Sequence, residues 1–206
     1  MPQPPNWSAE EAVSLVFGGM TALYYVRDLA GVKAGDRVLV HGASGAVGAA
    51  AVQIARHLGA EVHGVCSGSN AELVRGLGAT GVIDYAHVDP ASERDRYDVV
   101  IDTVGGRSFA DWRVALRAGG RCALVVAGWR DFLAAIRTSR ADRRVLVGVT
   151  PEHENNLREL VRLAEVGVLR PVVDSVFAIG DIVKAHARVD SNRKRGSVVV
   201  RFTPDA

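Results

Sequence analysis

The chain has 206 residues, of which 48% are hydrophobic and 23% are charged, and its formal net charge at pH 7 is +2. This is the composition of an ordinary globular protein, and so small a net charge argues against nucleic acid or an anionic membrane as a partner. The two cysteines are too few and too far apart for a disulfide framework or a metal site. No signal peptide or membrane-spanning apolar run is recognisable, so a cytoplasmic protein is expected.

The first part of the chain predicts two helices. Residues 1–7 are rich in proline and are expected to form an arm. Ser8 and Glu11 have the spacing of a capping box, which starts a helix. This helix should end near the glycine pair at 18–19, and a second helix should span 21–29.

Beyond residue 36 the sequence alternates between short apolar runs and helical segments. The apolar runs predict strands at residues 37–42, 61–66, 81–84, 97–102, 120–126 and 144–149. The segments between them predict helices at residues 46–58, 70–77, 107–117 and 130–138. Several strands are continuously apolar, so helices should cover both faces of the sheet. The expected fold class is α/β, a doubly wound parallel sheet of six strands (Rossmann type).

The pattern changes after Pro151. A strongly amphipathic helix is predicted at 155–166, followed by a strand at 171–179, a helix at 182–189 and a last strand at 197–202. This strand–helix–strand tail is additional to the six-stranded unit.

A glycine-rich turn joins the first predicted strand to the helix at 46–58. Its pattern is A-x-G-x-x-G, because Ala43 stands where the dinucleotide-binding pattern has its first glycine. Gly45 would let the backbone approach a pyrophosphate, and the N–H groups of Ala46 and Val47 would face the phosphates next to Ser44. The alternative is a strand–helix corner that simply needs small residues.

The sequence resembles the medium-chain dehydrogenase/reductase superfamily, and within it the zinc-free quinone-oxidoreductase-like branch. The stretches that carry the resemblance follow the superfamily's order: residues 18–23, 32–40, 43–48, 77–85, 97–106 and 195–199. Members of that superfamily begin with a GroES-like domain, which this sequence does not contain. The resemblance implies hinge helices at 1–30, an NAD(P)-binding domain at 31–166, and at 167–206 the returning segment of the missing GroES-like catalytic domain.

The end of the second predicted strand indicates which nucleotide is bound. An acidic residue there would hold the adenosine ribose of NAD, but the segment offers Ser67, Ser69 and Asn70 instead. NADPH is therefore favoured over NADH. The resemblance also places Tyr85 at a tyrosine that grips the 2′-phosphate, whereas Asn70 stands at the superfamily's lysine. Ser69 as a helix N-cap and Tyr85 as part of the core edge are the simpler alternatives.

The nicotinamide side should lie at the turns that follow the fourth and fifth strands. These turns contain Thr103, Val104 and Gly105, and Val126 and Ala127. An ordinary strand–helix turn is the alternative for both. The resemblance adds Thr21 as a polar contact from the hinge.

No catalytic residue is identified from the sequence, because no side chain is a convincing proton donor. His41, His63 and His87 are expected to be structural or exposed. The resemblance also argues against zinc, because the zinc-containing relatives have a cysteine ligand four residues before Thr21, and Phe17 stands there.

Other chemistries fit less well. No tyrosine has a lysine four residues later, which the short-chain dehydrogenases require. Residues 64–68 formally match a nucleophile elbow centred on Cys66, which is kept as an alternative. Two arginine-rich clusters, at 137–144 and 193–195, should be solvated edges or should contact a cofactor phosphate.

The sequence thus predicts an NADPH-dependent oxidoreductase that transfers hydride to a small-molecule quinone or α,β-unsaturated carbonyl. The alternative is a non-catalytic NAD(P)-binding fragment, or one subunit of a split reductase that needs a separate GroES-like chain. A homodimer is expected through the exposed edge of the strand at 145–149.

Overall fold

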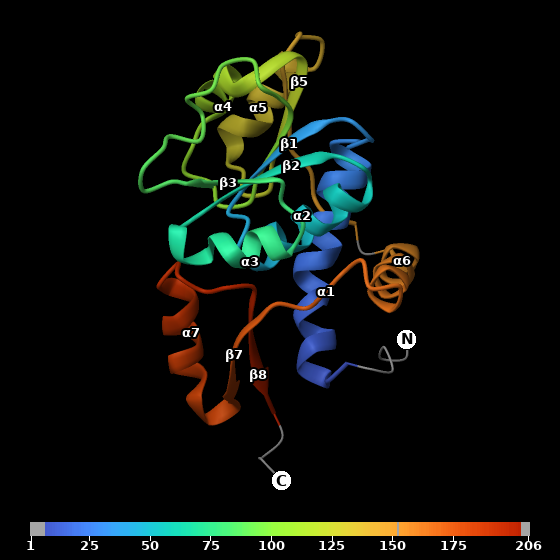
Figure 1. Cartoon of the computed structure of the whole chain (residues 1–206), viewed down its shortest axis with the longest axis vertical. Helices are drawn as coiled ribbons and strands as arrows, with labels where there is room; N and C mark the ends of the chain where they lie inside the picture. Colours follow the sequence, from blue (N-terminus) through green and yellow to red (C-terminus); the bar gives the residue numbers. More distant parts are fainter. Residues whose placement is uncertain (1–6, 152, 203–206) are drawn as a thin grey trace.

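The computed structural model describes residues 7–151 and 153–202, and its centre is a parallel sheet of six strands in the order β3-β2-β1-β4-β5-β6 (Figure 1). The strands are β1 (Arg37–His41), β2 (Glu61–Cys66), β3 (Gly81–Asp84), β4 (Tyr97–Asp102), β5 (Leu116–Leu124) and β6 (Arg144–Leu146). This is the strand order of doubly wound dinucleotide-binding folds, so the predicted fold class is confirmed.

Helices cover both faces of this sheet because its strands are apolar on both sides. The helices are α1 (Ala9–Leu23), α2 (Ala46–His57), α3 (Ala71–Gly76), α4 (Phe109–Ala115), α5 (Trp129–Thr138), α6 (Glu154–Glu165) and α7 (Ile182–Asp190). Val38 and Val40 of β1 are buried in one core with α1, α2 and α6. Leu39, between them, is buried in a second core with Trp112 of α4. Successive residues of one strand therefore supply the two cores.

The N-terminal region forms one continuous helix rather than the two that were predicted. Its start is as expected, because Ser8 Oγ accepts a hydrogen bond from Glu11 N and Glu11 Oε2 accepts one from Ser8 N. However, α1 continues through Gly18 and Gly19, and a π-helical turn (Tyr24–Leu29) follows directly. The glycines permit close packing instead of ending the helix: a Cβ on Gly18 would lie 2.5 Å from Ala46 O.

Two strand boundaries also differ from the predictions. β6 ends at Leu146 rather than at residue 149, and the following backbone is held by the π-helical turn: Tyr25 OH donates a 2.6 Å hydrogen bond to Gly148 O. β5 begins at Leu116 rather than at residue 120, and α4 is correspondingly shorter than the predicted helix. The register of β4 and β5 shifts between Tyr97 and Val99.

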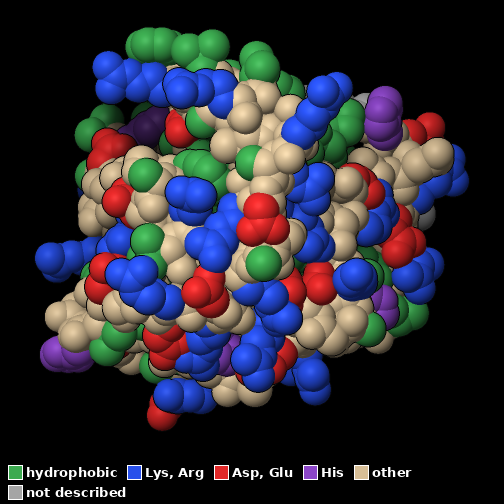
Figure 2. Space-filling model, turned by 90° about the horizontal axis from the view of Figure 1, so that it is seen from above, with side chains coloured by type: hydrophobic (Ala, Val, Ile, Leu, Met, Phe, Trp, Pro, Cys, Tyr) green, Lys and Arg blue, Asp and Glu red, His purple; other side chains and the backbone are tan. Residues whose placement is uncertain are grey.

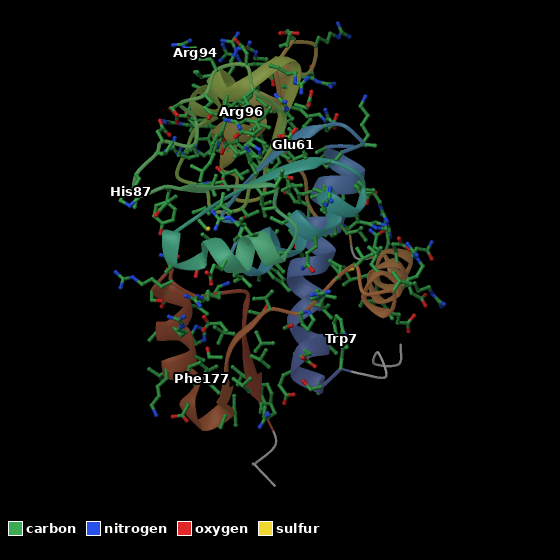
Figure 3. All side chains as sticks on the ribbon, in the orientation of Figure 1. Trp7, Glu61, His87, Arg94, Arg96 and Phe177 are labelled. Atoms are coloured by element: carbon green, nitrogen blue, oxygen red, sulfur yellow. The ribbon has the colours of Figure 1, made fainter. Side chains whose placement is uncertain are left out.

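The C-terminal tail forms a separate parallel pair, β7 (Val173–Ala178) and β8 (Ser197–Arg201), joined through α7. It lies against α1 (Figure 1), where Ser197 Oγ donates to Ser14 O at 2.8 Å. Figure 3 shows Phe177 in this lower unit and Trp7 beside α1. The predicted strand–helix–strand tail is present, and its first strand is shorter than predicted. The proline-rich arm lies outside the described residues, apart from Trp7.

The face that carries α4 and α5 bears many basic side chains, Lys or Arg, with acidic side chains between them (Figure 2). Arg143, from the cluster at 137–144, bonds to the carboxylate of Asp95, and Arg117 pairs with Asp98 at 2.5 Å. The cluster is therefore partly ion-paired and not wholly solvated. Among the described residues, none of the helices has the length and apolar character that a bilayer span would require.

Candidate functional site

The turns that follow β1, β4 and β5 meet at the carboxyl edge of the sheet. Thr103 Oγ1 donates to His41 O at 2.7 Å, which ties the β4 turn to the end of β1. A Cβ on Gly42 would lie 2.5 Å from Val104 Cγ2, and one on Gly105 would lie 3.2 Å from Val126 Cβ. The structure therefore brings together three of the predicted segments: the glycine-rich turn, Thr103–Gly105 and Val126–Ala127.

The glycine-rich turn leaves a set of backbone donors at the start of α2. Gly42 has a φ of 80°, and Gly48 packs so closely that a Cβ there would lie 2.1 Å from Gly42 O. Gly45 is the N-cap and has no side chain to cap the helix. Within the described chain, the N–H groups of Ala46 and Val47 have no hydrogen-bond acceptor. Such a helix start attracts anions through its free donors and its dipole.

The loop after β2 is tied to this turn through Asn70. Its Nδ2 donates to Ser44 Oγ at 3.1 Å, and its side chain is buried, with 8% of the residue exposed. Asn70 Oδ1 has no hydrogen-bond partner among the described residues. Ser67 Oγ and Ser69 Oγ lie 3.1 Å apart in the same loop. Asn70 N donates to Ser67 O at 2.9 Å, so Ser44 and the three predicted polar residues of this loop form one connected group.

The neighbouring end of β3 adds two residues to this group. Tyr85 is exposed and its N–H donates to Cys66 O at 3.3 Å, so it is not part of the core edge. Asp84, which was not predicted, also belongs here, because its carboxylate lies against Gly68 of the loop after β2. A Cβ on Gly68 would lie 2.5 Å from Asp84 Oδ2. Ser69 is not the N-cap of α3, because that helix begins after Asn70.

Asp102, at the end of β4, is the second residue that the sequence reasoning missed. It is 1% exposed, and its Oδ1 accepts from Val104 N and Gly105 N at 3.0 Å and lies 2.8 Å from His41 Nδ1. Its Oδ2 accepts from Trp112 Nε1 at 2.9 Å. Burial alone would raise the pKa of Asp102, but His41 and the N–H groups of Val104 and Gly105 outweigh burial and lower it. The ionised carboxylate thereby fixes the shape of the turn at 103–105.

Two other expectations meet a different environment. Thr21 Oγ1 donates to Phe17 O at 2.9 Å within α1, and no described interaction joins it to the turns at the sheet edge.

Cys66 is buried, and burial raises the pKa of its thiol to about 11. A thiol in that state is not a nucleophile at neutral pH, so the nucleophile-elbow alternative is disfavoured.

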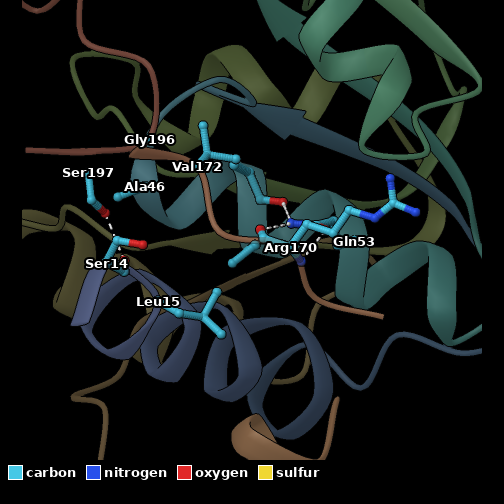
Figure 4. A pocket seen from close by; sticks show the side chains of 10 residues that line it. Ser14, Leu15, Ala46, Gln53, Arg170, Val172, Gly196 and Ser197 are labelled. Carbon is cyan, nitrogen blue, oxygen red and sulfur yellow. Dashed lines mark hydrogen bonds between the residues drawn. The ribbon is translucent and has the colours of Figure 1, made fainter. Parts of the chain in front are cut away.

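A small pocket lies between α1, the start of α2 and the C-terminal segment (Figure 4). Its polar walls bond to one another: Gln53 Oε1 accepts from Arg170 N at 2.8 Å, and Gln53 Nε2 donates to Arg170 O at 3.2 Å. Nearby, Gly196 N donates to Ser44 O at 2.7 Å. These bonds attach the C-terminal segment to α2 and to the glycine-rich turn.

The fold and this edge define a dinucleotide-binding α/β domain. Residues 77–200 match the family model described as zinc-binding dehydrogenase. The chain therefore belongs to this family, within the medium-chain dehydrogenase/reductase superfamily. No three His, Cys, Asp or Glu side chains among residues 7–151 and 153–202 are grouped so as to hold a metal ion.

Among its relatives, the chain is 34% identical over 221 residues to the spectinabilin polyketide synthase system protein NorB of Streptomyces orinoci. It is 32% identical over 231 residues to the trans-enoyl reductase poxH of Penicillium oxalicum. The solved quinone oxidoreductase from Coxiella burnetii superposes with a TM-score of 0.86 at 27% identity. These matches cover 97–98% of the chain, but only 10%, 58% and 64% of the three proteins, respectively.

Proposed function

We propose that this chain binds NADPH and takes part in reducing the carbon–carbon double bond of an α,β-unsaturated carbonyl. The observation that carries the proposal is the pair of N–H groups at Ala46 and Val47, which have no acceptor among the described residues and lie at the start of α2, after the turn that contacts the β4 turn. In doubly wound folds, a dinucleotide lies across this edge with its pyrophosphate at the start of the first helix.

The residues at this edge suit the successive parts of the nucleotide. The pyrophosphate would lie on the turn at 44–47, and the adenosine ribose would lie beside Ser67, Ser69 and Asn70, with Tyr85 at the border. The unpartnered Asn70 Oδ1 supports this placement, because a buried acceptor needs a donor such as a hydroxyl. The nicotinamide would face the turns at 103–105 and 126–127.

The bound cofactor supplies the hydride, and the protein mainly positions the reactants. Asp102 would contribute by holding the 103–105 turn in one shape. An enoyl substrate is favoured because the relatives include a trans-enoyl reductase. A quinone is the second candidate, supported by the Coxiella burnetii oxidoreductase.

The test is to titrate the purified chain with NADPH by calorimetry and then to follow NADPH oxidation with crotonyl-CoA or with a small quinone. We expect binding, and faster oxidation with the enoyl thioester than with the quinone. Faster oxidation of the quinone would overturn the substrate assignment. No binding of any nicotinamide nucleotide would contradict the proposal as a whole.

Binding without turnover would favour a second function, that of the cofactor-binding part of a reductase that needs a further domain or chain. This chain spans 58% of the length of the trans-enoyl reductase, which supports this second function. Adding a separately expressed GroES-like domain from such a relative should then restore turnover.

A further inference from the structure

We propose that Arg195, which precedes β8, binds the 2′-phosphate of NADPH and is the main determinant of a preference for NADPH over NADH. The inference rests on the proposed function, because it needs the pyrophosphate to lie at the start of α2. It assigns cofactor selection to the C-terminal unit instead of to the loop after β2 alone.

The C-terminal segment reaches the adenosine side of the site. Gly196 forms a parallel bridge with Gly45 and donates its N–H to Ser44 O at 2.7 Å. Arg195, one residue earlier, donates from its guanidinium to Ser69 O at 3.2 Å. In Figure 1 the end of α7 and the connection to β8 lie directly beneath the start of α3. Arg195 is thus at the carboxyl end of β2, where the adenosine ribose of a bound dinucleotide lies.

The position of Arg195 is fixed, while its charge is not neutralised. Asp174 Oδ1 accepts from Arg195 N at 2.7 Å, which anchors the backbone. The Asp174 carboxylate itself pairs with Arg188 at 2.6 and 2.7 Å. Among the described residues, no carboxylate forms a salt bridge with the Arg195 guanidinium. An exposed guanidinium with free donors matches the geometry of a phosphate.

Asn70 gives a second, independent indication that a ligand lies here. Its Oδ1 is unpartnered although the residue is more than nine-tenths buried, and its Nδ2 is held by Ser44 Oγ. The amide therefore offers one acceptor between the glycine-rich turn and Ser69, the residue that Arg195 contacts. An acceptor suits the 3′-hydroxyl of the ribose, which both nucleotides carry, whereas the arginine suits the phosphate that only NADPH carries.

One charge acts against the phosphate. Asp84 Oδ2 lies against Gly68 in the same loop, and a carboxylate there disfavours a second anion. The described side chains of the loop itself, at residues 67–70, carry no positive charge. The preference for NADPH thus depends on Arg195 outweighing Asp84, and Asp84→Asn should strengthen NADPH binding.

The test is calorimetric titration of the full chain with NADPH and with NADH, and with the fragments 2′,5′-ADP and 5′-AMP. Arg195→Gln should weaken binding of NADPH and 2′,5′-ADP by roughly ten- to a hundredfold, as expected for a charge-assisted bond to phosphate. Binding of NADH and 5′-AMP should change little. Arg193→Gln removes the same charge two residues away and serves as the matched control, which should leave all four affinities unchanged.

An unchanged ratio of NADPH to NADH affinity in Arg195→Gln would overturn the inference while leaving the proposed function intact. An equal loss in Arg193→Gln would also overturn it, because it would show a general charge effect. If the unaltered chain bound neither nucleotide, the proposed function itself would fail, and the inference with it. Thermal unfolding of each variant verifies that the exposed substitutions leave the fold unchanged.

Discussion

His63 is a polar side chain in the middle of β2 and is 8% exposed. Its Nδ1 lies 3.1 Å from Tyr97 OH, and its Nε2 lies 3.3 Å from Glu61 Oε1. Glu61 is the first residue of β2, and Arg96 directly precedes β4 (Figure 3). Burial, and then the positive charge of Arg96, lower the pKa of His63. The folded chain therefore keeps this imidazole neutral more readily than the unfolded chain does.

This difference predicts a pH-dependent stability. Because the folded pKa is below the unfolded one, the unfolded chain takes up the proton first, and stability falls as the pH drops below about 6.5. One proton contributes at most about 1.4 kcal/mol per pH unit. The free energy of unfolding, measured with urea at several pH values between 7.5 and 5.5, should depend less steeply on pH for His63→Gln than for the unaltered chain. An identical pH dependence of the two proteins would show that His63 does not titrate differently on folding.

Whether a residue of the site could be predicted from the sequence depends on whether its partners are close to it in the sequence. The place of Gly45, Ala46 and Val47 at the start of α2 could be predicted because the strand–turn–helix pattern is local in the sequence, and their contact with a cofactor stays a prediction. Asp102 could not be assigned, because its partners come from other parts of the chain. Arg195 was predicted only as part of an arginine-rich cluster with two alternative roles, because its partner Ser69 is also distant in the sequence. A carboxylate at the end of the apolar run in β4 was nevertheless a usable signal, since a buried charge must be paired.

Among the elements, α1 shows how packing overrides a local signal. Two consecutive glycines usually weaken a helix, yet α1 continues through them because they lie against other elements. A Cβ on Gly18 would meet the backbone of Ala46, and one on Gly19 would lie 2.6 Å from Leu160 Cδ1. The order and type of the elements could be predicted from periodicity, but the break at these glycines and the length of β6 depended on tertiary contacts.

Gly18→Ala should therefore destabilise the protein, although alanine favours helices. Overpacking against Ala46 should lower the free energy of unfolding by about 1–3 kcal/mol, measured by urea denaturation. Gly76→Ala in α3 is the matched control, since a Cβ there meets nothing within 4 Å, and it should stabilise by up to about 1 kcal/mol. Equal effects of the two substitutions would contradict the packing role of Gly18.

At the scale of the whole molecule, β6 forms one edge of the central sheet and, among the described residues, pairs only with β5. The helix beside it, α5, exposes three apolar side chains on one face: Trp129 (69%), Leu133 (51%) and Ile136 (72%). Open edges and apolar patches are both typical of interfaces. We retain the proposal of a homodimer through this edge and extend it to include α5, although β6 is shorter than the strand that was predicted.

Light scattering at micromolar concentrations should then give twice the mass of one chain. Ile136→Asp should shift the protein to a monomer, because it places a charge in the apolar interface. Val183→Asp, at a position on α7 that is 79% exposed, should leave the mass unchanged. A strict monomer in the unaltered protein would rule out the dimer.

The account as a whole requires that the start of α2 holds the cofactor pyrophosphate, and Gly45→Asp tests this most directly. Gly45 has an extended backbone that accepts a side chain (φ −79°, ψ 175°), and aspartate is a favoured N-cap, so the helix should keep or gain stability. Its carboxylate would occupy the donors and repel the pyrophosphate. We predict that calorimetric titration with NADPH shows affinity reduced by at least about 100-fold, at an unchanged or higher Tm. Undiminished NADPH affinity in a folded Gly45→Asp protein would contradict the account.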